Sequence, residues 1–309
     1  MKVFLTGASG YVARVTLPYL FQDEEISAVS GLDIRPPSVD HPKFNFVKGD
    51  VRSADWEGAL NGIDVVAHLA FIVTEIWDKK KIYDINVNGT RRVLEAVNKA
   101  GIRRLVVASS ASAYGSHPRK GEIITEETPC SGNTDSYYAH TKHLIEAMLD
   151  EFEEENPDVT VTRLRPTILC GAQTDNFFLD LLKHRLILYP TSNPEGLPLV
   201  YEQDAGKAFY LAIKKGIPGI FNIAAGNLSF RTIGSILGKP TFGCPYLLLK
   251  YMTDIGYFFG ISPFSSHWVT LGRYPISLST EKAKEILGWT PQCTPEEAFR
   301  EMLTSWKTR

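Results

Sequence analysis

Residues 1–13 read M-K-V-F-L-T-G-A-S-G-Y-V-A, and this stretch decides how the rest of the chain is interpreted. A short apolar run, Val3 to Leu5, leads directly into Gly7, Gly10 and Ala13, which have the spacing G-x-x-G-x-x-[GA]. Glycine lets a backbone turn sharply and approach a ligand closely, and the N–H groups at the start of a helix attract anions. The stretch therefore predicts a strand, a phosphate-binding turn and a helix, although a simple tight turn can have the same spacing. The residues expected around the phosphates are Gly7, Ser9, Gly10, Tyr11 and Val12.

The composition of the 309 residues fits a globular protein with a large core and disfavours several other classes. Hydrophobic residues make up 44% of the chain, and the net charge is −2 with both signs interspersed. A nucleic-acid-binding surface or a polybasic membrane patch would show as an excess of positive charge. No apolar run reaches the length of a membrane span, and no secretory leader is recognised. We therefore expect a cytoplasmic protein that binds a small molecule, with neither nucleic acid nor membrane as a partner.

The cysteine and histidine residues do not indicate a metal site or a set of disulfides. The four cysteines lie far apart and form no C-x-x-C pair. His140 and His143 are about one helical turn apart, but no third ligand follows nearby. We therefore expect no metal.

Apolar runs and amphipathic segments alternate through the first half of the chain. Several of the runs are continuously apolar, which is typical of strands whose two faces are both buried. This alternation predicts an α/β fold with a doubly wound parallel sheet and with ligands at the carboxyl ends of its strands. The expected strands are residues 2–6, 26–33, 44–48, 65–69, 104–108 and 159–165. The expected helices are residues 11–21, 56–60, 83–99 and 136–155.

The pattern changes after about residue 171, where prolines divide the chain into short pieces. This part is too irregular for a second sheet domain and too long for a loop. We expect a cofactor-binding domain at residues 1–170 and, mostly within residues 171–309, a smaller substrate-binding lobe with some segments that return to the main domain. A dense aromatic stretch falls in this lobe, and aromatic residues belong to a core more often than to a pocket. Its members are Phe242, Tyr246, Tyr251, Tyr257, Phe258, Phe259, Phe264 and Trp268.

An acidic residue follows the glycine-rich turn at the distance expected in a dinucleotide site. Asp33 ends the second predicted strand, about twenty residues beyond the turn. Its carboxylate can accept hydrogen bonds from the hydroxyls of an adenosine ribose and would repel a 2′-phosphate. This residue favours NAD over NADP. Arg35 lies close by and keeps NADP possible, because an arginine can accommodate the phosphate.

The ends of the next two strands supply further candidate contacts with the cofactor. The third strand runs into K-G-D-V-R, and the fourth runs through V-A-H-L-A-F. Because the carboxyl ends of parallel strands meet at one edge of the sheet, we expect both segments beside the adenosine. Asp50 is predicted to bind the adenine amino group and Val51 to pack on the ring. Leu69 and Ala70 are predicted to pass beneath the cofactor.

A tyrosine and a lysine one helical turn apart form a candidate acid–base pair. They are Tyr138 and Lys142, in the segment S-Y-Y-A-H-T-K. Residues four apart share one face of a helix, and an ammonium beside a phenol lowers the pKa of the phenol. Tyr138 would then serve as an acid–base at neutral pH, and Lys142 would also hold the nicotinamide ribose. A pair at this spacing is also common on ordinary helix surfaces, but here the strand at residues 104–108 leads into S-S-A-S-A-Y-G, whose hydroxyls can bind a substrate oxygen.

Taken together, these segments resemble the extended short-chain dehydrogenase/reductases, the NAD-dependent epimerase/dehydratase family. The resemblance rests on T-G-A-S-G-Y-V-A, Asp33, G-D-V, H-L-A, N-V-N-G-T, S-S-x-x-x-Y-G and Y-A-H-T-K. It extends to L-R-P-T-I-L-C-G at residues 164–171, a degenerate V-x-x-x-D-A at residues 200–205 and L-G-W-T-P at residues 287–291. It covers almost the whole chain and implies a Rossmann fold with NAD as the cofactor.

The resemblance also implies roles for individual residues. Its pattern makes Ser110 the catalytic serine, Tyr138 the acid–base and Lys142 the partner of Tyr138. It implies a homodimer that pairs through the helices near residues 83–99 and 136–155. The further residues that it places at the cofactor are Asn86, Ala108 and Pro166.

Departures from the family pattern narrow the reaction. Dehydratases of the family have an Asp–Glu pair after the catalytic hydroxyl, because eliminating water needs a further acid and base, whereas this chain has Ala111 and Ser112. Epimerases usually have a diphosphate-binding asparagine where this chain has Ile168, and an arginine where it has residues 197–199, Leu-Pro-Leu. A desolvated diphosphate needs paired donors. A nucleotide diphosphate sugar is therefore disfavoured as the substrate.

We expect an NAD-dependent oxidoreductase that transfers a hydride between nicotinamide and the carbon of a secondary alcohol or ketone. Tyr138 would remove the hydroxyl proton while Ser110 holds the oxygen. The segment L-R-P-T-I-L-C-G is similar to that of the 3β-hydroxysteroid dehydrogenase-like branch, which favours a less charged substrate. One alternative is a UDP-glucose 4-epimerase-like enzyme with tightly bound NAD. Another is a non-catalytic NAD-binding sensor, which is disfavoured because the chain retains the serine, tyrosine and lysine.

Overall fold

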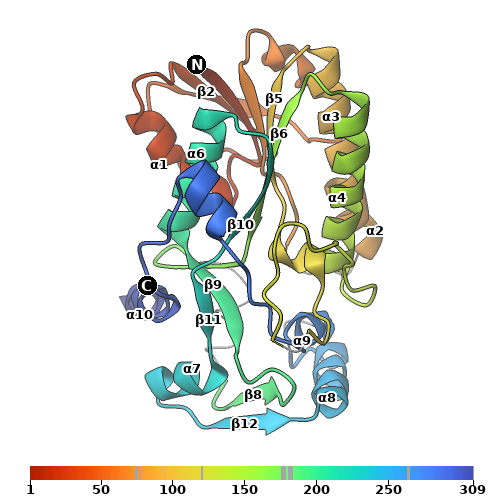
Figure 1. The fold of residues 1–309 in the computed structure, drawn as a ribbon, viewed down its shortest axis with the longest axis vertical. Coiled ribbons are helices and arrows are strands. Elements are labelled where there is room, and N and C mark those ends of the chain that lie inside the picture. Colours follow the sequence, from red (N-terminus) through yellow and green to blue (C-terminus); the bar gives the residue numbers. More distant parts are fainter. Residues whose placement is uncertain are drawn as a thin grey trace.

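A seven-stranded parallel sheet forms the centre of the protein in a computed structural model (Figure 1). The structure describes residues 1–73, 76, 78–119, 121–174, 179, 184–262 and 265–308. The strand order is β10-β6-β5-β4-β1-β2-β3, so the winding reverses between β1 and β4. Open parallel sheets bind ligands where this reversal occurs. The strands are β1 Lys2–Thr6, β2 Ala28–Asp33, β3 Phe44–Lys48, β4 Val65–His68, β5 Arg104–Ala108, β6 Thr160–Pro166 and β10 Gly219–Ile223.

Helices cover both faces of this sheet, which confirms the predicted doubly wound α/β fold (Figure 1). Successive residues of a strand point to opposite faces. Val3 and Leu5 of β1 accordingly pack with α1 and α6, whereas Phe4 packs on the other side with α3 and α4. Two buried faces therefore account for the continuous apolar runs in the sequence. These helices are α1 Tyr11–Gln22, α3 Gly89–Lys99, α4 Tyr137–Glu155 and α6 Glu202–Lys215.

The structure differs from the sequence prediction mainly around two expected helices. The segment expected as a helix at residues 56–60 is a short 3-10 helix at Glu57–Leu60. The helix expected at residues 83–99 consists of α2 Lys79–Tyr83, a π-helical turn at Asp84–Asn88, and α3. Such π-helical turns are frequent at functional sites. Here the turn contains one of the residues predicted at the cofactor.

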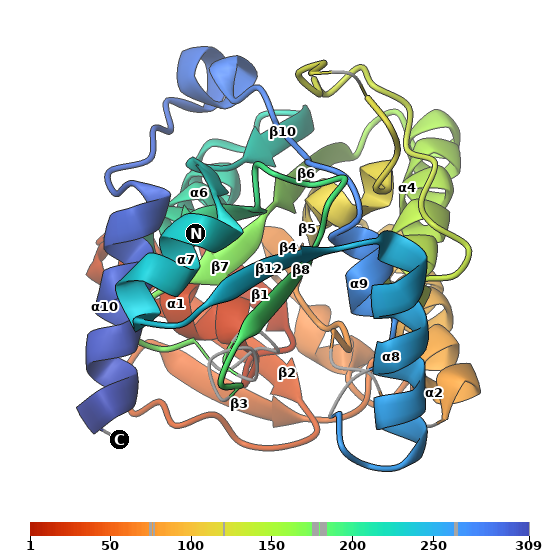
Figure 2. The ribbon, with the colours of Figure 1, turned by 90° about the horizontal axis from the view of Figure 1, so that it is seen from below.

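The lobe lies beyond one end of the sheet, in the lower half of Figure 1, and Figure 2 views the molecule from that end. It contains two small sheets, β11-β9-β7 and β12-β8, although the sequence is irregular there. Phe264 lies outside the described residues. In the part of the chain that the structure describes, no helix is both long and apolar enough to cross a bilayer. The helices and strands of the lobe are β7 Ile168–Cys170, β8 Ile187–Pro190, β9 Leu197–Tyr201, β11 Gly226–Leu228, α7 Phe230–Leu237, β12 Thr241–Cys244, α8 Tyr246–Phe258, α9 His267–Leu271 and α10 Pro295–Thr308.

Segments late in the sequence return to the main body. Helix α6 packs against α1, and β10 adds an edge strand to the large sheet beside β6. The fully buried Trp289 of L-G-W-T-P donates an indole hydrogen bond of 2.8 Å to the carbonyl of Asp204 in α6. The Asp204 carboxylate in turn accepts 2.8 Å from the N–H of Gln292. The C-terminal segment is thus fastened to the helix that covers one face of the sheet.

Candidate active site

The turn between β1 and α1 brings the backbone close to any ligand at the reversal point of the sheet. Gly7 has a φ of 73°, a left-handed conformation that favours glycine. A Cβ on Gly7 would lie 2.7 Å from both the Cα and the N of Ala70, so the chain that follows β4 passes directly against the turn. Gly10 caps α1 without a side-chain hydrogen bond. The first N–H groups of α1, which begins with Tyr11 and Val12, therefore face outward for an anion.

Asp33 lies at the end of β2, beside the same turn. One of its carboxylate oxygens accepts a 3.0 Å hydrogen bond from the N–H of Ser9, and the other accepts 3.2 Å from the N–H of Arg35. The Ser9 hydroxyl donates 2.6 Å to the carbonyl of Arg35. These contacts fix the carboxylate next to the phosphate-binding turn, at the position where a ribose is expected. The Arg35 side chain is exposed.

The residues after β3 form a network of ion pairs with the π-helical turn. Both carboxylate oxygens of Asp50 accept hydrogen bonds from the guanidinium of Arg52, at 3.0 and 2.6 Å. This hydrogen bonding lowers the pKa of Asp50 below its usual value. Arg52 also bridges to Asp84 in the π-helical turn at 2.7 Å. Val51 is buried against Gly89 at the start of α3.

The segment after β4 is held by two polar side chains. The hydroxyl of Thr6 accepts hydrogen bonds from the N–H groups of Leu69 and Ala70, at 3.2 and 3.3 Å. The amide of Asn86 accepts 2.8 Å from the N–H of Ile72 and donates 3.0 Å to its carbonyl. Asn86 is fully buried and therefore positions the backbone of the segment that contacts the glycine-rich turn.

A buried histidine links β1, β4 and α3 beneath this segment. The ring of His68 lies 2.7 Å from the hydroxyl of Thr6 and 2.9 Å from that of Thr90. Burial, and then the nearby charge of Lys142, lower the pKa of His68 to about 3. The imidazole is therefore neutral near pH 7, and it serves as a hydrogen-bonding link.

Ser110 and Tyr138 meet at the end of β5. The Ser110 hydroxyl accepts 2.9 Å from the hydroxyl of Ser112 and lies close enough to Tyr138 to act on its pKa. Burial raises the pKa of Tyr138 above its usual value, while the Ser110 side chain acts in the opposite direction. The lowered pKa expected for this tyrosine is therefore not found, because burial outweighs the effect of Ser110. The Ser110 and Tyr138 hydroxyls nevertheless lie close enough for one substrate oxygen to contact both.

Lys142 lies beneath this pair and has partners that the sequence did not predict. Its ammonium donates 2.6 Å to the carbonyl of Ala108 and lies 3.2 Å from the centre of the Phe71 ring. The distance from the ammonium to the centre of the Tyr138 ring is 5.9 Å. Burial lowers the pKa of Lys142 well below its usual value, and the negative charge of Glu146 opposes this. The lysine is thus on the predicted face of α4 but held by the strand end and an aromatic ring.

A buried ion cluster fixes α4 to β6. The Glu146 carboxylate accepts hydrogen bonds of 2.9 and 2.7 Å from the guanidinium of Arg165 and 3.1 Å from that of Arg163. The hydroxyl of Ser109 also donates to Glu146. Pro166 follows directly at the end of β6, beside β10. The sequence shows Glu146 four residues beyond Lys142, but its partners on β6 become apparent only in the fold.

A second buried carboxylate lies at the start of α6 and contacts the phosphate-binding helix. Glu202 accepts a 2.5 Å hydrogen bond from the hydroxyl of Tyr11 and two of 3.0 Å from the N–H of Gln173. Burial and the charge of Glu202 raise the pKa of Tyr11. The side chain of Tyr11 therefore holds the start of α1 against the start of α6.

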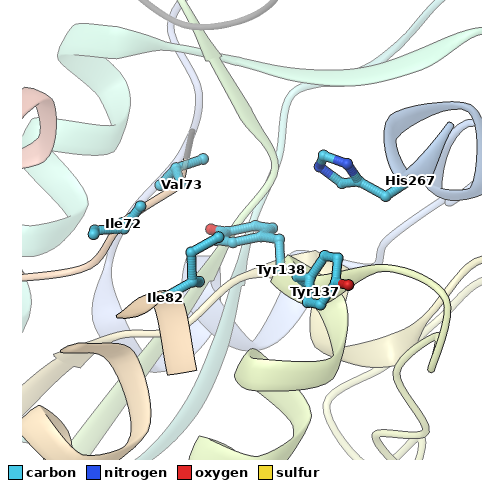
Figure 3. A pocket seen from close by; sticks show the side chains of 6 residues that line it. All are labelled: Ile72, Val73, Ile82, Tyr137, Tyr138 and His267. Carbon is cyan, nitrogen blue, oxygen red and sulfur yellow. The ribbon is translucent and has the colours of Figure 1, made fainter. Parts of the chain in front are cut away.

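A small cavity lies directly against Tyr138 (Figure 3). In Figure 3 the side chains of Ile72, Val73 and Ile82 lie on one side of the Tyr138 ring, and His267 of α9 lies on the other. The cavity measures about 10 Å³, which is the space of one water molecule. A substrate must therefore displace some of these side chains. The lining is apolar apart from the tyrosines and His267.

Helix α9 brings the lobe over the candidate catalytic tyrosine. The Trp268 ring lies 6.1 Å from that of Tyr138, centre to centre. The ring of the buried His267 lies 4.7 Å from that of Trp268, and its Nδ1 lies 3.0 Å from the hydroxyl of Ser265. The contact between Tyr138 and Trp268 joins residues far apart in the sequence, and no motif marks it. The described residues contain no group of three or more His, Cys, Asp or Glu side chains that could hold a metal ion.

Comparison with known proteins establishes the family. The NAD dependent epimerase/dehydratase family profile matches residues 3–224. The chain belongs to this family. The match runs from β1 to the end of β10 and therefore includes every strand of the large sheet, the glycine-rich turn and α4. NAD is the cofactor of the family, as its name states.

Relatives and solved structures match the chain over nearly its full length. The uncharacterized protein YbjS of Escherichia coli (strain K12) is 26% identical over 335 residues, which cover 99% of this chain and 97% of that protein. DesIV, a dTDP-glucose 4,6-dehydratase from Streptomyces venezuelae, has a TM-score of 0.78 at 21% identity, with 100% and 98% of the two chains covered. The UDP-glucose 4-epimerase of Thermotoga maritima has a TM-score of 0.77 at 20% identity, with 100% and 99% of the two chains covered. At such low identity these two structures establish a shared fold.

Proposed function

We propose that this chain is an NAD-dependent oxidoreductase that interconverts a secondary alcohol and a ketone, with Tyr138 as the acid–base. The observation that carries the proposal is the closeness of the Ser110 and Tyr138 side chains beside an apolar cavity at the carboxyl end of β5. A substrate oxygen within reach of both hydroxyls can exchange a proton with Tyr138 while Ser110 holds it in place.

The residues around the glycine-rich turn fit NAD. The close approach at Gly7 and the uncapped start of α1 suit the diphosphate, and the fixed carboxylate of Asp33 suits the two ribose hydroxyls. Bound there, NAD would supply the acceptor for a hydride. Asp33 favours NAD, and the exposed Arg35 is the residue that would accommodate an NADP phosphate.

The cavity lining supports a weakly charged substrate. Ile72, Val73 and Ile82 offer only apolar surface, and the one imidazole at the cavity is that of His267. A desolvated diphosphate would need paired cationic donors, and none of the residues that line this cavity is an arginine or a lysine. Substrate selection would then rest on apolar contacts and on the hydroxyl pair.

Replacing Tyr138 by Phe tests the proposal. We expect the rate of hydride transfer to fall by about two to four orders of magnitude, since proton transfer by a positioned side chain contributes that much. NAD binding should be unchanged. The matched control is Tyr83→Phe, which removes the same hydroxyl from a tyrosine that is exposed to 43% and does not line this cavity. The assay follows NADH absorbance with a panel of secondary alcohols and ketones; full activity in Tyr138→Phe would refute the acid–base role.

A nucleotide-sugar epimerase is the second candidate, favoured by the likeness in fold to a UDP-glucose 4-epimerase. In such a cycle the hydride returns to the other face of a transient ketone, so the cofactor need not leave. Denaturing the purified protein and identifying the released nucleotide separates the two candidates. Near-stoichiometric NAD or NADH would favour the epimerase, and a site that binds NAD reversibly would favour the dehydrogenase.

We also propose a homodimer that pairs through α3 and α4. The two helices contact each other on one face of the sheet, and their far sides carry charged residues such as Glu95 and Glu151 that are exposed in the single chain. Sedimentation of the purified chain tests this: a monomer at assay concentration would contradict it.

A further inference from the structure

Helix α8 of the lobe exposes its apolar side. The large apolar residues that it exposes recur at intervals of one, three and four positions, which places them on one face of a helix. Only Leu249 of the helix is buried. The exposed residues, together with two that follow the helix, are named the α8 apolar face. Its members are Leu247, Leu248, Tyr251, Met252, Ile255, Phe258, Phe259 and Ile261.

The polar residues of α8 face inward and fix the orientation of the helix. The ammonium of Lys250 pairs with the carboxylate of Asp135, just before α4, at 3.0 Å. The carboxylate of Asp254 accepts 2.9 Å hydrogen bonds from both the N–H and the hydroxyl of Ser266. An ordinary surface helix has its charges outside and its apolar residues inside. Here the arrangement is reversed, because the contacts of Lys250 and Asp254 hold α8 with its apolar side toward solvent.

The α8 apolar face exposes large aromatic and aliphatic side chains to a high degree. Phe258 is exposed to 77%, Phe259 to 69% and Ile261 to 78%. Large contiguous apolar patches on the surface of a monomer are often functional. We therefore expect a partner surface to cover the α8 apolar face.

The charge around this face indicates which occupant fits. Helix α2, with its three consecutive lysines, lies on the same side of the molecule as α8 in both views (Figures 1 and 2). A second copy of the chain would bring two positively charged surroundings together. An anionic surface would be attracted.

We propose that the α8 apolar face docks this protein on an anionic membrane surface, with α8 lying in the interface. A helix with aromatic and aliphatic residues on one face binds in the headgroup region without spanning the bilayer. The expectation of no membrane partner rested on the absence of a spanning segment and on the interspersed charges of the whole chain, and neither excludes an interfacial helix. The inference goes beyond the proposed function and does not depend on it.

Vesicle flotation of the full chain tests the proposal. We expect binding to vesicles of phosphatidylcholine with phosphatidylglycerol, weaker binding to phosphatidylcholine alone, and a loss of binding as salt is raised. The double variant Phe258→Ser/Phe259→Ser should lower the partition coefficient about tenfold or more, because two exposed rings no longer insert. The double variant Ile123→Ser/Ile286→Ser is the control, since both residues are exposed apolar residues outside α8, at 65% and 47%.

NAD binding and thermal unfolding of each variant check that the fold is retained. Absence of binding to either vesicle, or an equal loss in both double variants, would overturn the proposal. Equal binding to the two vesicle types would overturn its anionic requirement. A different outcome is a wild type that binds neither vesicle and sediments with a larger mass than Phe258→Ser/Phe259→Ser. In that case a second copy of the chain occupies the face, and the membrane proposal is wrong.

Discussion

Substituting Glu146 by Gln tests whether the buried ion cluster holds the catalytic helix to the sheet. The Glu146 side chain is exposed to only 3%, and Arg165 binds it through two hydrogen bonds. Burial raises the pKa of Glu146, but the hydrogen bonds and charge of Arg165 outweigh it and lower that pKa from 4.5 to about 2. The carboxylate is therefore charged throughout the physiological pH range.

The size of the effect follows from this shift. A pKa that falls from 4.5 to about 2 on folding contributes about 3 kcal/mol to the free energy of unfolding at neutral pH. Glu146→Gln also leaves Arg165 as an uncompensated buried charge, and breaking such a pair costs about 3–5 kcal/mol in total. The contribution of a depressed carboxyl pKa is fully present above pH 4.5 and is lost as the pH falls from 4.5 to about 2.

Urea unfolding at pH 7 and at a series of lower pH values measures both quantities. The control is Glu154→Gln, the same substitution at an exposed position of the same helix, which we expect to change stability by less than about 0.5 kcal/mol. A loss below about 1 kcal/mol for Glu146→Gln, with the acid dependence of the wild type retained, would refute the assignment of this cluster as the link between α4 and β6.

Three further predictions concern the cofactor turn and the core of the site. Gly7→Ala should weaken NAD binding about tenfold or more, because the new Cβ would lie 2.7 Å from the Ala70 backbone; unchanged affinity in an equilibrium titration would contradict it. Phe71→Ala should let water reach the Lys142 ammonium and so raise the pKa of Lys142. The pH above which kcat/KM falls should then move upward, and an unchanged pH would show that the Phe71 ring does not affect the pKa of Lys142. The pKa of His68 is depressed from 6.5 to about 3, so the protein should lose stability as the pH falls below 6.5, and His68→Asn should flatten that dependence in urea unfolding; an unaltered slope would count against it.

The sequence predicts the main body well because its local patterns and its buried environment agree. Val3 to Leu5 is apolar without interruption because both faces of β1 are covered. At Gly7 an added Cβ would lie 2.7 Å from the backbone of Ala70, so the packing requires glycine at a position that the sequence motif also marks. Tyr138 and Lys142 share a helix face because residues four apart must do so.

The remaining parts of the site depend on contacts between distant segments. The partners of the Lys142 ammonium are a strand carbonyl at Ala108 and the ring of Phe71, and neither is encoded by a spacing along α4. His267 reaches the cavity from a lobe whose short pieces give no clear period. The raised pKa of Tyr138 likewise follows from burial, which a helical spacing cannot show. Packing, rather than local pattern, determines these features.

Tyr138, Lys142 and Glu146 form one line along α4, each four residues from the next, and the charge of Glu146 acts on Lys142. Burial favours the neutral forms of Tyr138 and of Lys142, which suits a tyrosine that donates a proton to a ketone oxygen. Removing a proton from an alcohol instead needs an ammonium nearby to stabilise the phenolate. Glu146 is the group whose negative charge raises the pKa of Lys142 and so favours that ammonium. Glu146→Gln should therefore lower the kcat of alcohol oxidation more than the kcat of ketone reduction. A loss of stability alone would lower both rates by the same factor.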